Sequence, residues 1–197
     1  ITCHLGNGCS MTAIKNGKAI DTSMGFTPLE GIPMGTRSGD IDAAIIPYLM
    51  KVLHLPQGKI YYMLNRESGL KGVSQLSSDV RDLRKAKNNK QVKLAFEVMA
   101  YRIAKYIGAY ATALNGLDAI TFSGGIGQHA FYLREQICNY LSFLGLKLDN
   151  QKNKNNEKII TTIKSKIKVF VIPTDEEKEM AIQAYQALKK APKIINY

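Results

Sequence analysis

Residues 4–10 read His-Leu-Gly-Asn-Gly-Cys-Ser, and strand-prone residues stand on both sides of them. Residues 1–3 and 11–14 are suited to β-strands, and Asn16-Gly17 predicts a tight turn before a third strand at 18–22. Gly6 and Gly8 have no Cβ and can adopt positive φ. Backbone N–H groups of such a loop can converge on an anion, most naturally a phosphate. Because short glycine motifs are not specific, an ordinary glycine-rich hairpin is the alternative.

The composition is that of a globular protein, with 45% hydrophobic and 22% charged residues among 197. No apolar run is long enough for a membrane span and no signal peptide opens the sequence, so we expect a cytoplasmic protein without a membrane partner. The three cysteines lack metal-binding spacing, which favours reduced thiols. Because the first residue is Ile1 and it lies inside a predicted strand, we expect the sequence to be a piece of a longer protein.

The chain is basic, with 27 Lys and Arg residues against 16 Asp and Glu residues and a formal net charge of +11. Such a charge permits binding to nucleic acid or to an anionic ligand. Much of the excess lies at 85–93 and 152–168, where no aromatic residue provides a stacking surface for bases. We therefore expect a solvated basic surface and no nucleic-acid partner.

Residues 23–40 contain several glycines and prolines, so they predict a structured loop. Arg37 is the notable side chain in it, because a guanidinium can hold a phosphoryl or carboxylate group with two parallel hydrogen bonds. The alternative is a surface arginine paired with Asp40 or Asp42. Ser38 or Asp40 would cap a helix at 41–53, which a short helix at 59–65 and a turn-rich connection at 68–72 follow.

Residues 77–82 read Ser-Ser-Asp-Val-Arg-Asp and predict a helix start capped by Ser78 or Asp79. Asp79 and Arg81 could contact the ribose or base of a ligand, or could form a local ion pair, and the sequence leaves both open. A long helix is expected at 89–115, with Gly116 as its stop. Its apolar stripe, read as core or dimer seam, is Val92, Phe96, Met99, Ile103, Ile107, Tyr110 and Leu114.

A strand at 118–123 leads into Gly-Gly-Ile-Gly-Gln-His at 124–129, and a helix is expected at 130–144. Strand, glycine turn and helix form a setting in which backbone can approach a nucleotide closely. The segment is not the dinucleotide-binding fingerprint, because Ala130 stands where that motif has its third glycine.

The sequence after residue 145 is rich in Lys and Asn, with weak strand signals at 159–163 and a clear buried strand at 168–173. Thr174 or Asp175 would cap a last helix at 176–189. Carboxylates in the first turn of a helix are favoured by its dipole alone. Glu176 also stands just past a strand end, where an α/β sheet presents groups to ligands and Mg²⁺.

Taken together, these motifs resemble the C-terminal half of acetate kinases, in the acetokinase family. The resemblance rests on HLGNG (residues 4–8), MGFTPLEG (24–31), MGTRSGDID (34–42), SSDVRD (77–82), GGIG (124–127) and VIPTDEE (171–177). It implies an α/β domain of the RNase H-like (actin, Hsp70 and sugar-kinase) superfamily, with a mixed sheet and helices on both faces. The implied division is a nucleotide-binding domain at 1–190, a tail at 191–197, and an N-terminal domain absent from this chain.

The resemblance also implies an activity, the reversible transfer of a phosphoryl group from ATP to acetate, giving acetyl phosphate and ADP. Mg²⁺ or Mn²⁺ is the implied cofactor, and propionate or another short-chain carboxylate is the alternative substrate. The family's dimerisation through this half implies a homodimer, to which the helix at 89–115 is a candidate contributor. Because the missing half carries other catalytic groups in the family, the isolated chain is expected to be inactive.

Residue roles follow by matching motifs. The HLGNG loop would hold the ATP phosphates through His4, Leu5, Gly6, Asn7 and Gly8, and Arg37 would steady the transferring phosphoryl group. The remaining implied nucleotide contacts are Asp79, Val80, Arg81, Gly125, Ile126, Gly127, Gln128 and His129, and the implied Mg²⁺ ligand is Glu176.

One motif departs from the family. The usual Gly-Ile-Gly-Glu-Asn reads Gly-Ile-Gly-Gln-His at 125–129, after Gly124 in place of the common alanine. The Glu carboxylate and the Asn amide are thereby lost, although the backbone approach to the nucleotide is kept. A non-catalytic nucleotide-binding remnant is therefore a further alternative.

Overall fold

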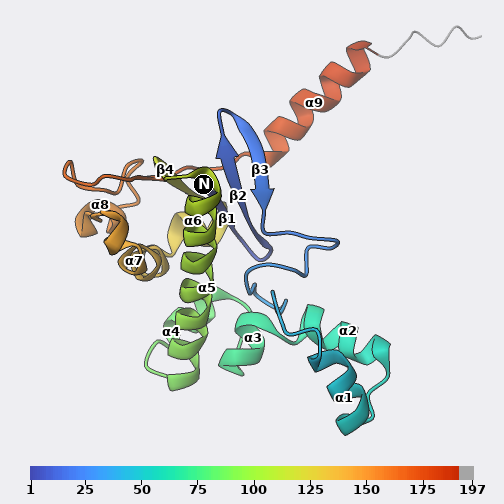
Figure 1. The fold of residues 1–197 in the computed structure, drawn as a ribbon. Helices are drawn as coiled ribbons and strands as arrows, with labels where there is room; N and C mark the ends of the chain where they lie inside the picture. The colour runs from blue at the N-terminus through green and yellow to red at the C-terminus, as the bar shows by residue number, and fades with distance from the viewer. Residues whose placement is uncertain (191–197) are drawn as a thin grey trace, which may run out of the picture.

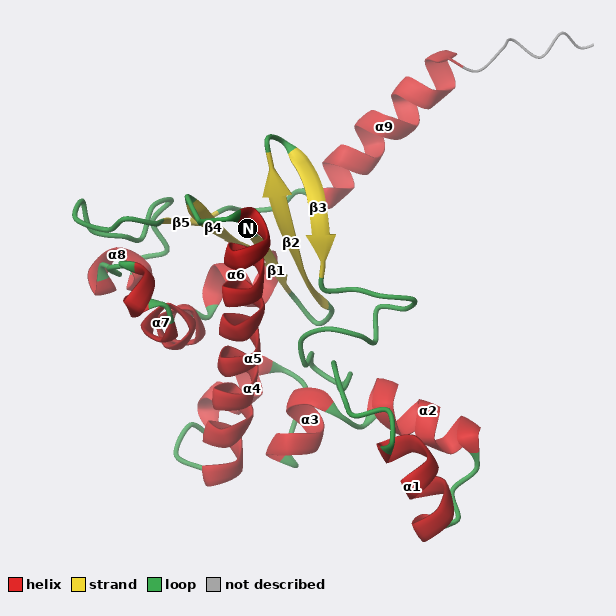
Figure 2. Ribbon diagram, viewed as in Figure 1, coloured by secondary structure: helices red, strands yellow, loops and turns green. Residues whose placement is uncertain are grey.

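A five-stranded mixed sheet organises the molecule (Figures 1 and 2). The computed structural model describes residues 1–190, and the expected tail at 191–197 lies outside them. The strands are β1 (Thr2–Leu5), β2 (Cys9–Lys15), β3 (Lys18–Thr22), β4 (Ala119–Ser123) and β5 (Lys168–Val171), in the spatial order β3-β2-β1-β4-β5. β1 is antiparallel to β2 but parallel to β4, and β4 is parallel to β5. The expected mixed α/β sheet is confirmed.

Helices fill the two long connections of the sheet. Between β3 and β4 the chain forms α1 (Ile45–Leu53), α2 (Gln57–Arg66), α3 (Gly69–Ser74), α4 (Val80–Lys85) and α5 (Lys90–Leu114). Between β4 and β5 it forms α6 (Gly124–His129), α7 (Phe131–Tyr140), the 3₁₀ turn Ser142–Leu144 and α8 (Asn150–Lys154). After β5, α9 (Glu176–Lys190) projects away from the sheet (Figure 1). No helix within residues 1–190 is long and apolar enough to cross a lipid bilayer.

The core lies on one face of the sheet. Alternate strand residues such as Cys3, Leu5, Met11, Phe122 and Val169 are fully or almost fully buried, as the two-residue period of a half-covered strand predicts. Their neighbours in the chain, which point to the other face, are only half buried. Both α5 and α6 pack against the buried face of the sheet.

The long helix α5 forms as the sequence predicts. Asn89 caps its first turn by accepting hydrogen bonds from two backbone N–H groups, and Asn115 ends it in the left-handed conformation. Gly116 follows with φ of +135°. The predicted stripe is buried in the chain's own core except for Leu114, which is partly buried. The sequence left two predictions for this stripe, a place in the core or in a dimer seam, and the structure supports the core.

Candidate functional site

The glycine loop joins β1 to β2 in only three residues. His4 and Leu5 belong to β1 and Cys9 begins β2, so the connection itself is Gly6-Asn7-Gly8. The Gly6 N–H donates to the carbonyl of Gly8 at 3.0 Å, whereas the N–H groups of Asn7 and Gly8 have no partner among the described residues. Two adjacent unpaired N–H groups can bind an anion.

The two glycines do not use their freedom to adopt positive φ. Neither Gly6 nor Gly8 lies in the left-handed region. What the loop requires is space, because a Cβ on Gly6 would lie 3.3 Å from the Gly8 carbonyl oxygen. Cys9 beside the loop is not a nucleophile, since burial raises the pKa of its thiol to about 12.

Arg37 lies against this loop. A Cβ built on Gly8 would come 3.6 Å from the Arg37 Nη1 atom, which also contacts Pro28 O at 3.4 Å and Met34 Sδ at 3.5 Å. No carboxylate within residues 1–190 pairs with Arg37. The alternative of a surface ion pair with Asp40 or Asp42 is therefore not what the structure shows, and the guanidinium is available to an anionic ligand.

The predicted helix start at 41 is wrong, because Asp40 has a different use. Its Oδ1 atom accepts from the N–H of Gly31 at 2.8 Å, and its Oδ2 atom accepts from Arg102 at 2.9 Å and Tyr106 at 2.7 Å. These bonds tie the loop to α5. The helix then begins at Ile45, without a side-chain cap.

Hydrogen bonds from the start of α3 hold the loop that carries Arg37. The structure corrects the expected turn at 68–72, because α3 begins at Gly69. Its N-terminal N–H groups donate to the loop: Ser68 to Thr36 O, Leu70 to Met34 O and Lys71 to Gly35 O, at 2.8–2.9 Å. These carbonyls take the place of a side-chain cap, and they fix the backbone that leads into Arg37.

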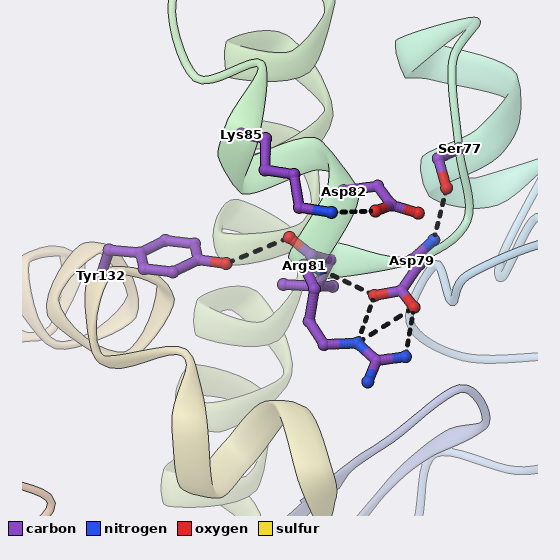
Figure 3. Close-up of polar contacts among 7 residues, drawn as sticks. Ser77, Asp79, Arg81, Asp82, Lys85 and Tyr132 are labelled. Carbon is purple, nitrogen blue, oxygen red and sulfur yellow. Dashed lines mark hydrogen bonds and ion pairs between the residues drawn. The ribbon is translucent and has the colours of Figure 1, made fainter.

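Asp79 caps α4 as predicted, and it also forms an ion pair with Arg81 (Figure 3). Its carboxylate accepts from the Arg81 N–H at 2.8 Å and faces the guanidinium, with Asp79 Oδ2 2.6 Å from Arg81 Nη2. The hydrogen bonds to Arg81 lower the pKa of Asp79 to about 2, so the carboxylate is charged at neutral pH. The local ion pair that the sequence left open is thus present, and both side chains also line the cleft described next.

A cleft of about 700 Å³ brings three of the sequence motifs together. The glycine loop provides Gly6 and Asn7, α4 and its cap provide residues 78–81, and α6 provides Gly125, Ile126 and His129. Arg84, Ala130 and Tyr132 complete the wall. This volume and mixed lining are typical of a small-molecule site.

Two smaller hollows extend this cleft. One, of about 330 Å³, contains Gly6, Asn7, Gly8, Arg37 and His4. The other, of about 370 Å³, contains His4 together with Gly125 and residues 174–177. Because neighbouring hollows share residues, the three form one track from Tyr132 past the glycine loop to Arg37 and Glu176.

Glu176 stands at the far end of this track. Its Oε1 atom lies 3.5 Å from His4 Nε2, and its side chain is 68% exposed. No group of three metal-binding side chains occurs among the described residues. Mg²⁺ needs no such group, because it is commonly held by one or two carboxylates together with water and substrate phosphates. An exposed carboxylate beside the glycine loop fits that role.

Three of the predicted nucleotide residues do not line the track. The side chain of Leu5 is fully buried in the core, Gly127 is buried, and Gln128 is not among the residues that line the cleft or the two hollows. The segment 124–129 is also a short helix, α6, instead of the expected turn. Gly127 and Gln128 act through their carbonyls, which accept hydrogen bonds from Arg134 at 2.7 Å.

Arg134 is a supporting residue that sequence reasoning missed. It is 0% exposed, and all five of its N–H donors are used: two on Gly127 and Gln128, two on Asn153 and one on Asn156. The sequence does contain one indication of its role, because Arg134 lies between Leu133 and Ile137 on the apolar face of α7. A charged residue at a core position indicates a buried polar network.

Comparison with known proteins gives the family. The model of the acetokinase family matches residues 1–182. The chain belongs to the acetokinase family. It is 51% identical to an acetate kinase of Pseudothermotoga lettingae over 98% of this chain and 49% of that protein. The chain spans about half the length of the curated relatives that it matches.

Solved structures of the family share the fold. A crystal structure of Porphyromonas gingivalis acetate kinase superposes with a TM-score of 0.90 at 42% identity, over 95% of this chain and 48% of that one. A propionate kinase from Francisella tularensis superposes with a TM-score of 0.85 at 45% identity, over 89% of this chain and 46% of that one. The acetokinase resemblance and its α/β fold are thereby confirmed.

Proposed function

We propose that this chain is the nucleotide-binding part of a kinase that transfers a phosphoryl group between ATP and acetate, giving ADP and acetyl phosphate. The observation that carries the proposal is the track, in which a cleft of nucleotide size adjoins two unpaired N–H groups and Arg37. The names of its acetokinase relatives support the same reaction.

In this proposal each part of the track has a role. The base and ribose lie in the cleft between α4 and α6, with Asp79, Val80 and Arg81 on one side and Gly125, Ile126 and His129 on the other. The phosphates lie on the N–H groups of Asn7 and Gly8. Arg37 then meets the transferring phosphoryl group, where a cationic donor stabilises the charge that develops in the transition state.

The proposed cofactor is Mg²⁺ or Mn²⁺, held by Glu176. A bound divalent ion would neutralise phosphate charge and orient the nucleotide. The carboxylate of Asp175 is less available, because it accepts from the N–H of Lys178 at 3.1 Å and caps α9. His4 lies between Glu176 and the phosphate loop, and its Nδ1 atom is 3.4 Å from the hydroxyl of Ser123.

Two alternatives have specific support. Propionate as substrate is favoured by the 45% identity to the Francisella propionate kinase. A non-catalytic remnant is favoured by Gln128 and His129, which replace the acid and the amide usual in the family. Because the matched relatives are about twice as long, we also propose that turnover requires a further domain. Acetyl phosphate formation by the 197-residue chain alone would contradict that part of the proposal.

Calorimetric titration with MgADP and MgATP tests the nucleotide site. We expect saturable binding by the wild-type chain and at least tenfold weaker binding by Gly8→Val, since the branched side chain would fill the space between the loop and Arg37. Gly58→Val is the matched control, because a Cβ on Gly58 meets nothing within 4 Å. Equal losses in the two variants, or no binding by the folded wild type, would contradict the proposal.

We further propose that the protein is a homodimer and that α1 lies in its interface. Eight of its nine residues are apolar, yet none is buried. The exposed fractions of Tyr48 and Val52 reach 61% and 49%. A helix that is apolar on nearly all sides is normally covered. Because the stripe of α5 is already buried in the core, α1 is the better-supported contributor.

Light scattering after size-exclusion chromatography tests this interface. We expect the wild type to have the mass of a dimer and Tyr48→Glu/Val52→Glu to have the mass of a monomer, because charges in an apolar interface are strongly unfavourable. Leu94→Glu/Phe143→Glu places the same charges on exposed apolar positions outside α1 and should remain dimeric. A monomeric wild type at high concentration would contradict the proposal.

We also propose a cytoplasmic location. All three cysteines are free and buried. Reduced thiols are typical of proteins in that compartment.

A further inference from the structure

A second cavity, of about 830 Å³, lies beside the nucleotide cleft. It is bounded by the end of α4 and the connection to α5, by α5 itself and by α7. The proposed kinase reaction makes no use of it. Its volume is within the range of cavities that bind small organic ligands.

The rim of this cavity is basic. Arg84, Lys87 and Lys93 line it, and Glu97 is the one carboxylate among its lining residues. None of the three cations forms an ion pair with a carboxylate in the described part of the chain. Unpaired cations around a concave surface favour a ligand with more than one negative charge.

The floor of the cavity is aromatic. Phe96 is 5% exposed and meets the ring of Tyr132 edge to face, with ring centroids 5.3 Å apart. The amides of Gln136 and Asn139 stand on the α7 wall, and Glu97 stands on the α5 wall. Such a floor suits a planar ring, while amide and carboxylate groups can exchange hydrogen bonds with its edge.

The two cavities share a wall. The guanidinium carbon of Arg84 lies 4.4 Å from the centre of the Tyr132 ring, and both residues line the nucleotide cleft as well. The hydroxyl of Tyr132 donates to the carbonyl of Val80 at 3.5 Å, at the first residue of α4. A ligand that draws Arg84 toward the second cavity would therefore alter the wall of the first.

We propose that this cavity is a second nucleotide site, separate from the nucleotide cleft and coupled to it through Arg84. The phosphates of a nucleoside diphosphate lie between Lys87 and Lys93, and the base packs on Tyr132 and on Tyr140, which lines the same cavity and is 41% exposed. The proposal stands on the cavity's own lining and does not depend on catalysis at the other site.

A tryptophan introduced at Gln136 reports on this cavity, because the chain has no native tryptophan. Gln136 is exposed, so the substitution does not disturb the core. We expect ADP to quench the fluorescence of Gln136→Trp saturably. Adding Lys87→Gln/Lys93→Gln should weaken this response at least tenfold. Lys15→Gln/Lys18→Gln, on the exposed β2–β3 hairpin, removes the same charge and should leave it unchanged.

Other ligands and variants separate the possible sources of the signal. We expect adenosine and pyrophosphate each to bind at least tenfold more weakly than ADP, and we expect quenching to survive Gly8→Val. Loss of quenching with Gly8→Val would show that the signal comes from the nucleotide cleft and would overturn the proposal. Pyrophosphate binding as tightly as ADP would overturn the nucleotide assignment.

Equilibrium dialysis gives a measurement without the introduced tryptophan. The wild-type chain should bind two ADP molecules, and Lys87→Gln/Lys93→Gln should bind one at the same ligand concentration. One ADP per chain in both proteins, or an equal effect of Lys15→Gln/Lys18→Gln, would refute a second site.

Discussion

Arg134→Ala is expected to lower the free energy of unfolding by about 4 kcal/mol. The guanidinium is fully buried and bonds to five oxygen acceptors, none of which belongs to a carboxylate. Burial lowers the pKa of Arg134 to about 10, so the side chain is still charged at neutral pH. Its removal leaves the acceptors on Gly127, Gln128 and Asn153 without their donors.

The same variant should weaken nucleotide binding. Gly127 and Gln128 lie in the last turn of α6, and Gly125, Ile126 and His129 of the same helix line the nucleotide cleft. Arg134 holds that turn against Asn153 at the end of α8, 19 residues further along the chain. Without this connection we expect α6 to lose its fixed position and the affinity for MgADP to fall at least tenfold.

Urea unfolding followed by circular dichroism measures the loss of stability, and titration at low temperature measures binding by the folded fraction. Arg66→Ala is the matched control, because Arg66 is exposed at the end of α2 and should change stability by less than about 0.5 kcal/mol. Arg134→Met keeps volume and apolar contact, so a loss close to that of Arg134→Ala would show that the hydrogen bonds decide the effect. Equal stability of Arg134→Ala and wild type would contradict this account of the network.

The sequence predicted those elements whose signals are local. The strands around the glycine loop, the hairpin turn at Asn16-Gly17 and the capped helix α5 have periodicity and end signals within a few residues. Asp79 as a cap was predictable for the same reason. Family resemblance then identified the motifs that meet in the cleft, although they are separated by up to about 120 residues.

The elements that were mispredicted depend on distant partners. Asp40 looks like a helix cap, but its carboxylate is taken by Gly31, Arg102 and Tyr106. The weak strand signals at 159–163 give only isolated bridges, Ile159 with Phe170 and Thr161 with Leu148, so this segment meets the free edge of β5 without forming a full strand. The role of Arg134 likewise could not be predicted, because its partners, Asn153 and the carbonyls of α6, are brought to it only by the fold.

Gly69→Ala is expected to destabilise the chain by about 3 kcal/mol and to displace the loop that carries Arg37. Gly69 has φ of +60°, and an added Cβ would collide with the carbonyl of Met34 and lie 2.6 Å from that of Arg37. Neither contact can be relieved by turning a side chain, since both atoms are backbone. The loop must therefore move away from α3, and the hydrogen bonds from Leu70 and Lys71 to this loop lengthen.

This displacement should be visible in both stability and binding. Arg37 follows the loop, so we expect MgATP to bind more weakly to Gly69→Ala than to wild type even under conditions where both are folded. Gly108→Ala is a control for which the expected change in stability has the opposite sign. Gly108 lies in the middle of α5, and an added Cβ would meet nothing within 4 Å. Alanine at this position should stabilise the helix by up to about 1 kcal/mol. Thermal unfolding separates the two variants directly. If Gly69→Ala unfolded at the wild-type temperature and bound MgATP normally, α3 would not be what holds Arg37 beside the phosphate loop.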